Sequence, residues 1–425
     1  MPPIRFIHAA DLHLDAAFSG LSRDIPADFA ERLRTATFTA FRRLLDLCER
    51  ESPDFLLLAG DVYNQEDASV SAQLALRDGF RRLESLSIPV FLVHGNHDPL
   101  ASRLRSVRWP GNVTVFGELP GAVPVFRKGE GTPLAIIHGA SHASGRETRN
   151  LAALFRRTEA YGLHVGLLHA TPGDADGVAR YAPFSQEDLK ASGMDYWALG
   201  HIHDRREVCR EPLAAYPGCT QGLHINEPGE KGCLLVTAEA RPDGGYAVRT
   251  SFRPLGPAVW KTLDMDLGGA ASLDELENRL RTGLDRAAAE VWSGCEMLLV
   301  RLRLQGRTEL DGLLRKGTTC AELADRLRED GNGVPRIWIK DIDVATRPCV
   351  ERGALLERED LLGEVFRLSE AARTASGLQA LREGPLAPLF AHARAGKALE
   401  PLTDEELARL LDDAESLCLD LLEND

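Results

Sequence analysis

Seven side chains able to bind metal ions follow five short apolar runs in the first half of the chain. They are Asp11, His13, Asp61, Asn96, His169, His201 and His203. Carboxylate, amide and imidazole ligands without thiolates suit Mn²⁺, Fe²⁺ or Zn²⁺ better than a structural zinc site. Two such ions about 4 Å apart can hold a hydroxide at neutral pH and neutralise a phosphoryl oxygen. The residue types therefore indicate hydrolysis of a phosphoester by a pair of metal ions.

The spacing of these residues predicts how they divide between two ions. Residues two apart in an extended segment point the same way, so Asp11-x-His13 and His201-x-His203 can each converge on one centre. Asp61 can bridge the ions through its two oxygens. The first ion then receives Asp11, His13 and His203, and the second receives Asn96, His169 and His201.

The stretch Gly95-Asn96-His97-Asp98 contains two further residues with predicted catalytic roles. His97, beside a predicted ligand, is free to stabilise the transition state or to protonate the leaving oxygen. Asp98 is predicted to orient the His97 imidazole. Six other histidines are expected to be core, strand-end or outer residues and not ligands: His8, His94, His138, His142, His164 and His224.

These residues need a layered α/β fold to bring them together. Residues 55–58 predict a strand that is buried on both faces, and Gly60 allows the turn that delivers Asp61 to the carboxyl edge of the sheet. Helices are predicted over 26–50, 69–86 and 150–161, with strands before each further ligand. Segments 232–238 and 246–252 are expected to form a hairpin that completes a second sheet. Residues 1–98 thus alternate β-α-β-α-β.

The length of 425 residues predicts two or three domains. The metal-binding residues belong to a predicted domain at 1–255, which ends at the linker Pro254-Leu255-Gly256-Pro257. Strand and helix patterns over 258–350 predict a small α+β domain. Residues 355–425 are predicted to be helical, and the last helix carries a stripe of leucines.

The formal net charge of −14 at pH 7 is unevenly distributed. Residues 401–425 contain nine acidic residues against Arg409 alone, a net charge of −8, so a basic face for DNA elsewhere is not excluded. No apolar run is long enough to span a bilayer, so no membrane association is expected. Eight cysteines without a Cys-x-x-Cys pair favour reduced thiols and a cytoplasmic location.

The motifs Asp11-x-His13, Gly60-Asp61, Gly95-Asn96-His97-Asp98, His169 and Gly200-His201-Ile202-His203 resemble the five motifs of the calcineurin-like metallophosphoesterases. Residues 7–15 and 216–222, with Asn226-Glu227 and Lys231-Gly232, resemble the SbcD-type DNA exonuclease subunits, especially their YhaO-like branch. The resemblance implies a four-layer α/β/β/α sandwich, a capping domain that binds DNA, and C-terminal helices that dock a coiled-coil, SMC-like ATPase subunit of the SbcC type. It also implies a manganese-dependent exonuclease and endonuclease that acts on DNA ends in repair, usually as a homodimer.

One position departs from the pattern of this family. Some of its nucleases carry a histidine three residues after the bridging aspartate, where it is implicated in exonuclease action. This chain has Asn64 there. The departure bears on processive exonuclease activity and leaves the predicted ligands intact.

Contacts to DNA phosphates are predicted for arginines near the metal residues, and the alternative is a solvated basic rim. These arginines are Arg103, Arg105, Arg108, Arg205 and Arg206. Two other functions stay open. A phosphatase or cyclic-nucleotide phosphodiesterase would act on small substrates, although such an enzyme needs no long C-terminal part. A catalytically weak DNA-end clamp that regulates an ATPase is supported by Asn64 alone.

Overall fold

The computed structural model describes residues 2–21, 25–64, 69–101, 107–173, 180–242, 244–329, 333–349, 351–392 and 402–422. The chain forms two compact units. The first contains Met1–Leu263, Arg281–Leu302 and Glu322–Ile342, and the second contains Asp264–Leu280, Arg303–Ala321 and Asp343–Asp425.

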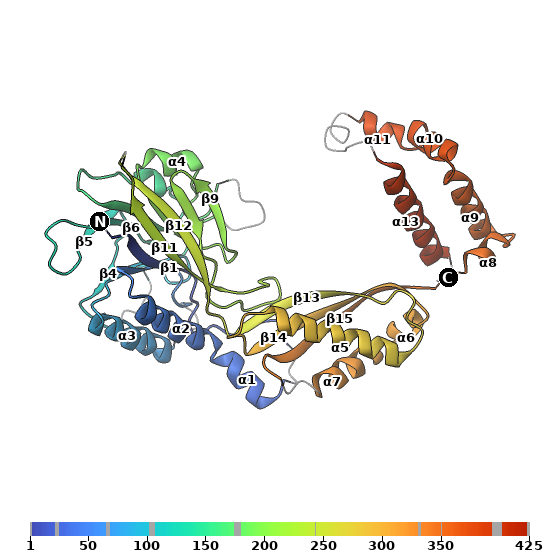
Figure 1. Cartoon of the computed structure of the whole chain (residues 1–425), viewed down its shortest axis with the longest axis horizontal. Helices are drawn as coiled ribbons and strands as arrows, with labels where there is room; N and C mark the ends of the chain where they lie inside the picture. The colour runs from blue at the N-terminus through green and yellow to red at the C-terminus, as the bar shows by residue number, and fades with distance from the viewer. Residues whose placement is uncertain are drawn as a thin grey trace. The chain divides into compact units, whose positions relative to one another are not determined.

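The first unit is built on two six-stranded sheets (Figure 1). The strands of the first sheet, in spatial order, are β12 (Tyr246–Pro254), β11 (Gly232–Ala240), β1 (Ile4–Ala9), β2 (Phe55–Ala59), β3 (Val90–Val93) and β4 (Val113–Val115). Those of the second are β5 (Gly121–Val125), β6 (Ala135–Ala140), β7 (Leu163–His169), β8 (Tyr196–Gly200), β10 (Leu213–Tyr216) and β9 (Arg206–Arg210). The strands from β1 to β4 are parallel, as are β6, β7, β8 and β10. Their carboxyl ends therefore deliver the following loops to one edge of each sheet.

Alternating residues of the buried strands face different layers. Leu57 of β2 packs between the sheets with Phe6 and Val165, whereas its neighbours Leu56 and Leu58 face the helices. Those helices are α2 (Ala36–Glu51) and α3 (Val70–Ser85). On the far side of the second sheet, α4 (Gln186–Ala191) and the short 3-10 helix η1 (Ala152–Leu154) cover another core cluster. The resulting order of layers is α/β/β/α, which confirms the predicted fold class (Figure 1).

Two predicted helices differ from the structure. The helix expected over 26–50 is broken at Thr35 into α1 (Ala27–Arg34) and α2. The Thr35 hydroxyl donates to the carbonyl oxygens of Glu31 and Arg32, which closes α1 before α2 begins. The helix expected over 150–161 is only η1, because the chain then turns to extended backbone at Phe155 and Arg157 binds the end of α4 through Ser192 O.

The predicted hairpin exists, but its assignment to the second sheet is wrong. β11 and β12 are antiparallel, and β11 pairs with β1 from Ile4 opposite Ala238 to His8 opposite Leu234. The hairpin therefore extends the first sheet. Its alternating pattern defines two strands but not which free edge they join.

A three-stranded sheet follows, in the order β13 (Ala258–Asp266), β14 (Met297–Thr308) and β15 (Arg336–Pro348). The helices near it in sequence are α5 (Leu273–Glu290), α6 (Asp311–Leu314) and α7 (Thr319–Glu329). The strands of this sheet have residues in both compact units.

The rest of the second unit is helical. Its helices are α8 (Arg352–Leu356), α9 (Leu361–Ala372), α10 (Ala375–Glu383), α11 (Ala387–Ala391) and α13 (Asp404–Leu422). Leu362 and Phe366 of α9 pack against Leu419 of α13. Arg352 forms ion pairs with Glu370 and Glu415, which fixes α8 against both helices. Among the described residues, no helix combines the length and apolar character needed to cross a bilayer.

Candidate metal centre

Loops from both sheets of the first unit supply the predicted metal ligands. In the first sheet, β1 leads to Asp11 and His13, β2 to Asp61, and β3 to Asn96. In the second sheet, β7 ends on His169, and β8 leads to His201 and His203. The structure brings these seven residues together at one edge of the sandwich, although up to 192 positions separate them in the sequence, from 11 to 203.

The first cluster contains Asp11, His13 and His203. The Nε2 atoms of the two histidines lie 3.1 Å apart, and His203 Nε2 lies 3.8 Å from Asp11 Oδ1. Asp11 and His13 are almost fully buried, and the His203 side chain is 31% exposed. These three side chains therefore face one small space that is open to solvent on the His203 side.

The second cluster contains Asp61, His169 and His201, with Asn96 beside it. Asp61 Oδ2 lies 3.3 Å from His169 Nε2 and 4.0 Å from His13 Nε2 of the first cluster. Asn96 Oδ1 lies 3.0 Å from His169 Nε2. Asp61 thus stands between the two clusters, as a bridging carboxylate would.

The donor atoms fit a pair of divalent ions. Atoms that share an ion at about 2.0–2.2 Å stand about 3–4 Å apart. The separations of 3.1 and 3.8 Å in the first cluster and of 3.3 Å in the second fall in that range. The donors are imidazole nitrogens, carboxylate oxygens and one amide oxygen, a set that suits Mn²⁺, Fe²⁺ or Zn²⁺.

Four of the seven residues have a left-handed backbone. The φ angles are 50° at Asp11, 40° at His13, 49° at Asp61 and 102° at His201. Each such conformation costs about 1–3 kcal/mol in a residue that is not glycine. The turns are held by hydrogen bonds from Asp11 N to Gly60 O and from His13 N to Asp61 O, both of 3.1 Å. The chain therefore bends sharply where it presents these ligands.

Burial and neighbouring charges set the protonation of the centre. Burial acts to raise the pKa of Asp61, but the charge and hydrogen bond of His169, together with the charge of His13, outweigh it and hold that pKa well below its usual value. For His169, burial acts to lower the pKa, but Asp61 outweighs it and raises that pKa to about 9. The carboxylate between the clusters is therefore ionised at neutral pH.

Asp98 has a different role from the predicted one. Its Oδ1 accepts from Asp61 N and Gly95 N, and its Oδ2 accepts from Val62 N and lies 3.3 Å from His94 Nδ1. The predicted orientation of His97 by Asp98 is therefore wrong, because these contacts occupy both oxygens and Asp98 ties two ligand-bearing loops together instead. The His97 side chain is exposed, and its ring centroid lies 5.2 Å from that of His13.

Sequence comparisons assign the chain to a family. A family model described as calcineurin-like phosphoesterase matches residues 4–205, and one described as the middle domain of metallophosphoesterase YhaO matches residues 260–347. An uncharacterised metallophosphoesterase, YhaO, of Bacillus subtilis is 34% identical over 387 residues, which cover 90% of this chain and 91% of the relative. The chain belongs to the YhaO-like metallophosphoesterases.

The DNA double-strand break repair protein Mre11 of Aeropyrum pernix is more distant, at 27% identity over 68% of this chain and 69% of that protein. A putative 5'-nucleotidase from Staphylococcus aureus aligns with a TM-score of 0.38 at 13% identity, over 67% of this chain and 58% of that structure.

Two residues that touch the centre of this YhaO-like chain were missed as functional residues. Glu227 Oε1 lies 2.5 Å from His203 Nδ1, and Asn64 Oδ1 lies 2.6 Å from His13 Nδ1. Burial acts to raise the pKa of Glu227, but the hydrogen bond to His203 and the charge of that histidine outweigh it and lower the pKa to about 2. In the sequence, Glu227 is visible only as part of a family resemblance, and Asn64 only as a departure from that resemblance.

The six histidines that were predicted not to be ligands lie outside both clusters. His8 Nδ1 lies 2.9 Å from the Tyr196 hydroxyl, and His142 Nε2 lies 2.6 Å from His169 O. His138 and His164 contact each other, and His224 contacts Glu227.

Three of the five predicted DNA-contacting arginines are described. Arg205 stacks over Phe252 at 4.0 Å and Arg206 over Tyr216 at 5.5 Å, and both are exposed. Arg108 is exposed as well. Arg103 and Arg105 lie outside the described residues. The arginines that follow His203 are thus held by aromatic rings.

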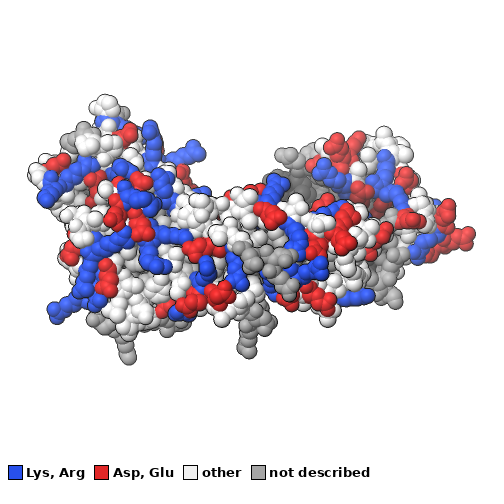
Figure 2. Space-filling view, turned by 60° about the horizontal axis from the view of Figure 1, so that its bottom comes forward, with Lys and Arg blue, Asp and Glu red and all other residues white. Residues whose placement is uncertain are grey.

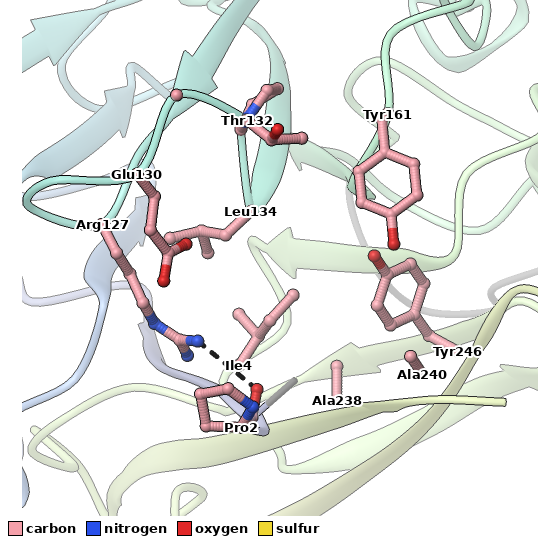
Figure 3. A pocket seen from close by; sticks show the side chains of 12 residues that line it. Pro2, Ile4, Arg127, Glu130, Thr132, Leu134, Tyr161, Ala238, Ala240 and Tyr246 are labelled. Atoms are coloured by element: carbon pink, nitrogen blue, oxygen red, sulfur yellow. Dashed lines mark hydrogen bonds between the residues drawn. The ribbon is translucent and has the colours of Figure 1, made fainter.

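A cavity of about 310 Å³ lies beside Pro2 and Ile4, where β1 begins (Figure 3). Ile4, Leu134 and Ala238 line its apolar part, and Tyr161 and Tyr246 turn their hydroxyls toward each other at one side (Figure 3). None of the 12 lining residues is a predicted metal ligand.

Proposed function

We propose that this chain is a DNA nuclease that hydrolyses phosphodiesters with two divalent ions, with Mn²⁺ favoured over Fe²⁺ or Zn²⁺. The observation that carries the proposal is the position of Asp61, whose Oδ2 lies 3.3 Å from a histidine of one cluster and 4.0 Å from a histidine of the other. Asp11, His13 and His203 would hold one ion, Asn96, His169 and His201 the other, and Asp61 both.

The chain's own side chains would divide the chemistry. When bound, the two ions supply a hydroxide at neutral pH and neutralise charge on the phosphoryl oxygens. Asp61 is buried and ionised between the clusters, so its carboxylate would offer a charged oxygen to each ion. His97 N donates to Asp61 Oδ1 at 2.9 Å, which places the exposed His97 imidazole beside the centre. His97 would protonate the leaving oxygen or stabilise the transition state.

DNA as the substrate is supported by the Mre11 relative, whose name refers to DNA double-strand break repair. Figure 2 shows a face of the first unit on which Lys and Arg side chains cover more area than Asp and Glu. Arg205 and Arg206 are held by aromatic rings just after a predicted ligand, so their guanidinium groups lose little freedom when they bind phosphate. We include Arg103, Arg105 and Arg108 in the proposed DNA contact.

A coiled-coil ATPase subunit is the proposed partner, docked by the helical segment 355–425. Leucines are exposed along α13 at positions 410, 417 and 421, with 45, 57 and 65% exposure, and along α9 at 361 and 368. Residues spaced in this way lie on one face of a helix and suit a partner helix. We also propose a homodimer, with a nuclease domain at 1–255 and a DNA-binding capping domain at 258–350. The eight cysteines, all within the described residues, are free, which supports the cytoplasm as the location.

The decisive experiment compares three substrates with purified protein in Mn²⁺. Linear duplex DNA should be cut, whereas p-nitrophenyl phosphate and cyclic nucleotides should be turned over much more slowly. Faster turnover of the small substrates with intact DNA would establish a phosphatase or phosphodiesterase. DNA binding that stimulates an ATPase without cleavage would establish a clamp.

A further inference from the structure

Each of the two histidines of the first cluster forms a hydrogen bond through the ring nitrogen that points away from the centre. Their Nε2 atoms face each other at 3.1 Å, toward Asp11. Their Nδ1 atoms point outward, His13 to Asn64 Oδ1 at 2.6 Å and His203 to Glu227 Oε1 at 2.5 Å. Each ring therefore has one nitrogen in the centre and the other on a side-chain oxygen.

This arrangement fixes the tautomer of both rings. An oxygen that accepts from Nδ1–H keeps the proton on that nitrogen, and the lone pair of Nε2 is then free to bind a metal. We propose that Asn64 and Glu227 are positioning residues for the first metal ion, one for each histidine. The inference rests on the metal centre of the proposed function and adds two residues to it.

Glu227 is itself held rigidly. It is 7% exposed, its Oε2 accepts from Leu223 N at 2.7 Å, and its own N–H donates to His224 O at 2.9 Å. The same loop contributes Lys231, whose Nζ donates to His203 O at 3.0 Å. The loop thus contacts both the ring and the backbone of His203.

The neighbouring group His203, Cys219 and Glu227 has donor atoms close enough for a third ion. The 2.5 Å contact from His203 Nδ1 to Glu227 is a hydrogen-bond distance, and a ring nitrogen that donates a proton cannot also bind a metal. The geometry therefore favours Glu227 as a support for the first ion over a third site.

The two positioning residues, Glu227 and Asn64, differ in charge. The difference matters because position 64 is where this chain departs from the pattern of its family. Glu227 places a carboxylate behind His203, which makes that ring a more basic ligand. Asn64 places a neutral amide behind His13. The residue that replaces the histidine of some related nucleases therefore has a function of its own at the metal centre.

Titration of the full chain with Mn²⁺ tests the inference without any substrate. Glu227→Ala and Asn64→Leu should each weaken one of the two Mn²⁺ sites by about 10- to 100-fold in calorimetric titration and leave the other site unchanged. Electron paramagnetic resonance at two equivalents of Mn²⁺ should then show an isolated ion in place of a spin-coupled pair. Asn64→Asp keeps an acceptor for His13 Nδ1–H and should restore the pair.

Matched controls separate this effect from general damage. Asn112 donates to Phe80 O and Ile88 O, and Asp54 accepts from Arg5 N and Arg127, so both are bonded in the first unit without contact to a ligand. Asn112→Ala and Asp54→Asn should keep both Mn²⁺ sites. If Glu227→Ala does not fold, by circular dichroism, Glu227→Gln provides the test. Its single oxygen cannot serve both His203 and Leu223 N, so it should also weaken one site.

Three results would overturn the inference. The first is unchanged Mn²⁺ binding in Asn64→Leu and Glu227→Ala proteins that are folded. The second is equal weakening of both Mn²⁺ sites in these variants, and the third is the loss of a third equivalent of metal in Glu227→Ala. Wild-type protein that binds two ions, loses one in these variants and cuts no DNA would support the inference and refute the nuclease function. Wild-type protein that binds no pair of ions would refute both.

Discussion

Replacing Asp98 by asparagine tests whether this residue holds backbone N–H groups or orients His97, the proposed catalytic histidine. The side chain is fully buried and accepts from the N–H groups of Asp61, Val62 and Gly95 at 3.3, 3.0 and 2.7 Å. Asparagine has nearly the same shape but only one oxygen. If that oxygen keeps the bonds to Asp61 and Gly95, an amide NH₂ faces the Val62 N–H.

The expected loss of stability follows from these bonds. One buried donor without an acceptor costs about 1–3 kcal/mol. The two hydrogen bonds that remain are accepted by a neutral amide in place of a carboxylate. A hydrogen bond to a charged group stabilises the fold by about 1 kcal/mol more than one to a neutral group. Asp98→Asn should therefore lower the free energy of unfolding of the first unit by about 3–5 kcal/mol. It should also weaken Mn²⁺ binding, because Asp61 stands between both clusters.

Tryptophan fluorescence during urea unfolding measures the stability. All five tryptophans, at positions 109, 197, 260, 292 and 338, belong to the first unit, so the signal reports on it alone. Calorimetric titration with Mn²⁺ and cleavage of linear DNA complete the assay, with His97→Ala as the comparison. An Asp98→Asn protein with wild-type unfolding and Mn²⁺ affinity, but with the cleavage defect of His97→Ala, would refute the assignment to the backbone.

Three further predictions concern single residues of the first unit. His97→Ala should reduce DNA cleavage by about 10²- to 10⁴-fold, since a proton donor is lost, while calorimetry shows both Mn²⁺ sites intact; unchanged cleavage would remove His97 from the mechanism. Gly95→Ala should abolish binding at the second Mn²⁺ site and weaken it at the first, which shares Asp61, because the added Cβ would lie 2.3 Å from Asp61 Oδ1 and 2.8 Å from the His169 ring; a titration with two intact sites would contradict this. Burial, with the charge of His164, lowers the pKa of His138 to about 4. As the pH falls below about 6.5 the unfolded chain binds this proton first, so stability should drop by about 1.4 kcal/mol per pH unit until about pH 4. His138→Leu should therefore lose less stability between pH 7 and pH 5 in urea unfolding than the wild type, and equal slopes would rule out this histidine as a source of acid sensitivity.

The sequence allowed the layered fold and the grouping of seven residues to be predicted, because both depend on local signals. Runs such as 55–58 are apolar on both faces, and each ends directly on a polar residue, so their strands and edges are visible without a structure. The first residues of helices were predictable where the sequence contains a helix N-cap motif. Ser185 and Asp188 form a capping box at the start of α4, and Thr403 and Glu406 form another at the start of α13. A Ser or Thr followed three residues later by an acidic residue is visible in the sequence as a helix start.

The break of the predicted 26–50 helix at Thr35 is local, since Thr35 bonds to Glu31 and Arg32, but the other failures involve contacts between distant parts of the chain. The orientation of Asp98 depends on backbone N–H groups 36 and 37 residues earlier. The support of His203 by Glu227 depends on the course of the chain through β9 and β10, which lie between these two residues. The choice of sheet for the β11–β12 hairpin depends on which edge, at β1, was free. Such contacts leave no periodicity or spacing in the sequence.

Each proposed ion would take ligands from both halves of the sandwich. Asp11, His13, Asp61 and Asn96 follow strands of one sheet, and His169, His201 and His203 belong to the other. The ions would then join the two sheets at the edge where these loops meet, in addition to the apolar core that packs between the sheets. Removing the ions with a chelator should loosen the contact between the two sheets first at the edge that carries the ligands. Amide hydrogen exchange should therefore rise first at the carboxyl ends of β7 and β8. Metal supply would in this way govern not only turnover but also how long the folded protein resists proteolysis.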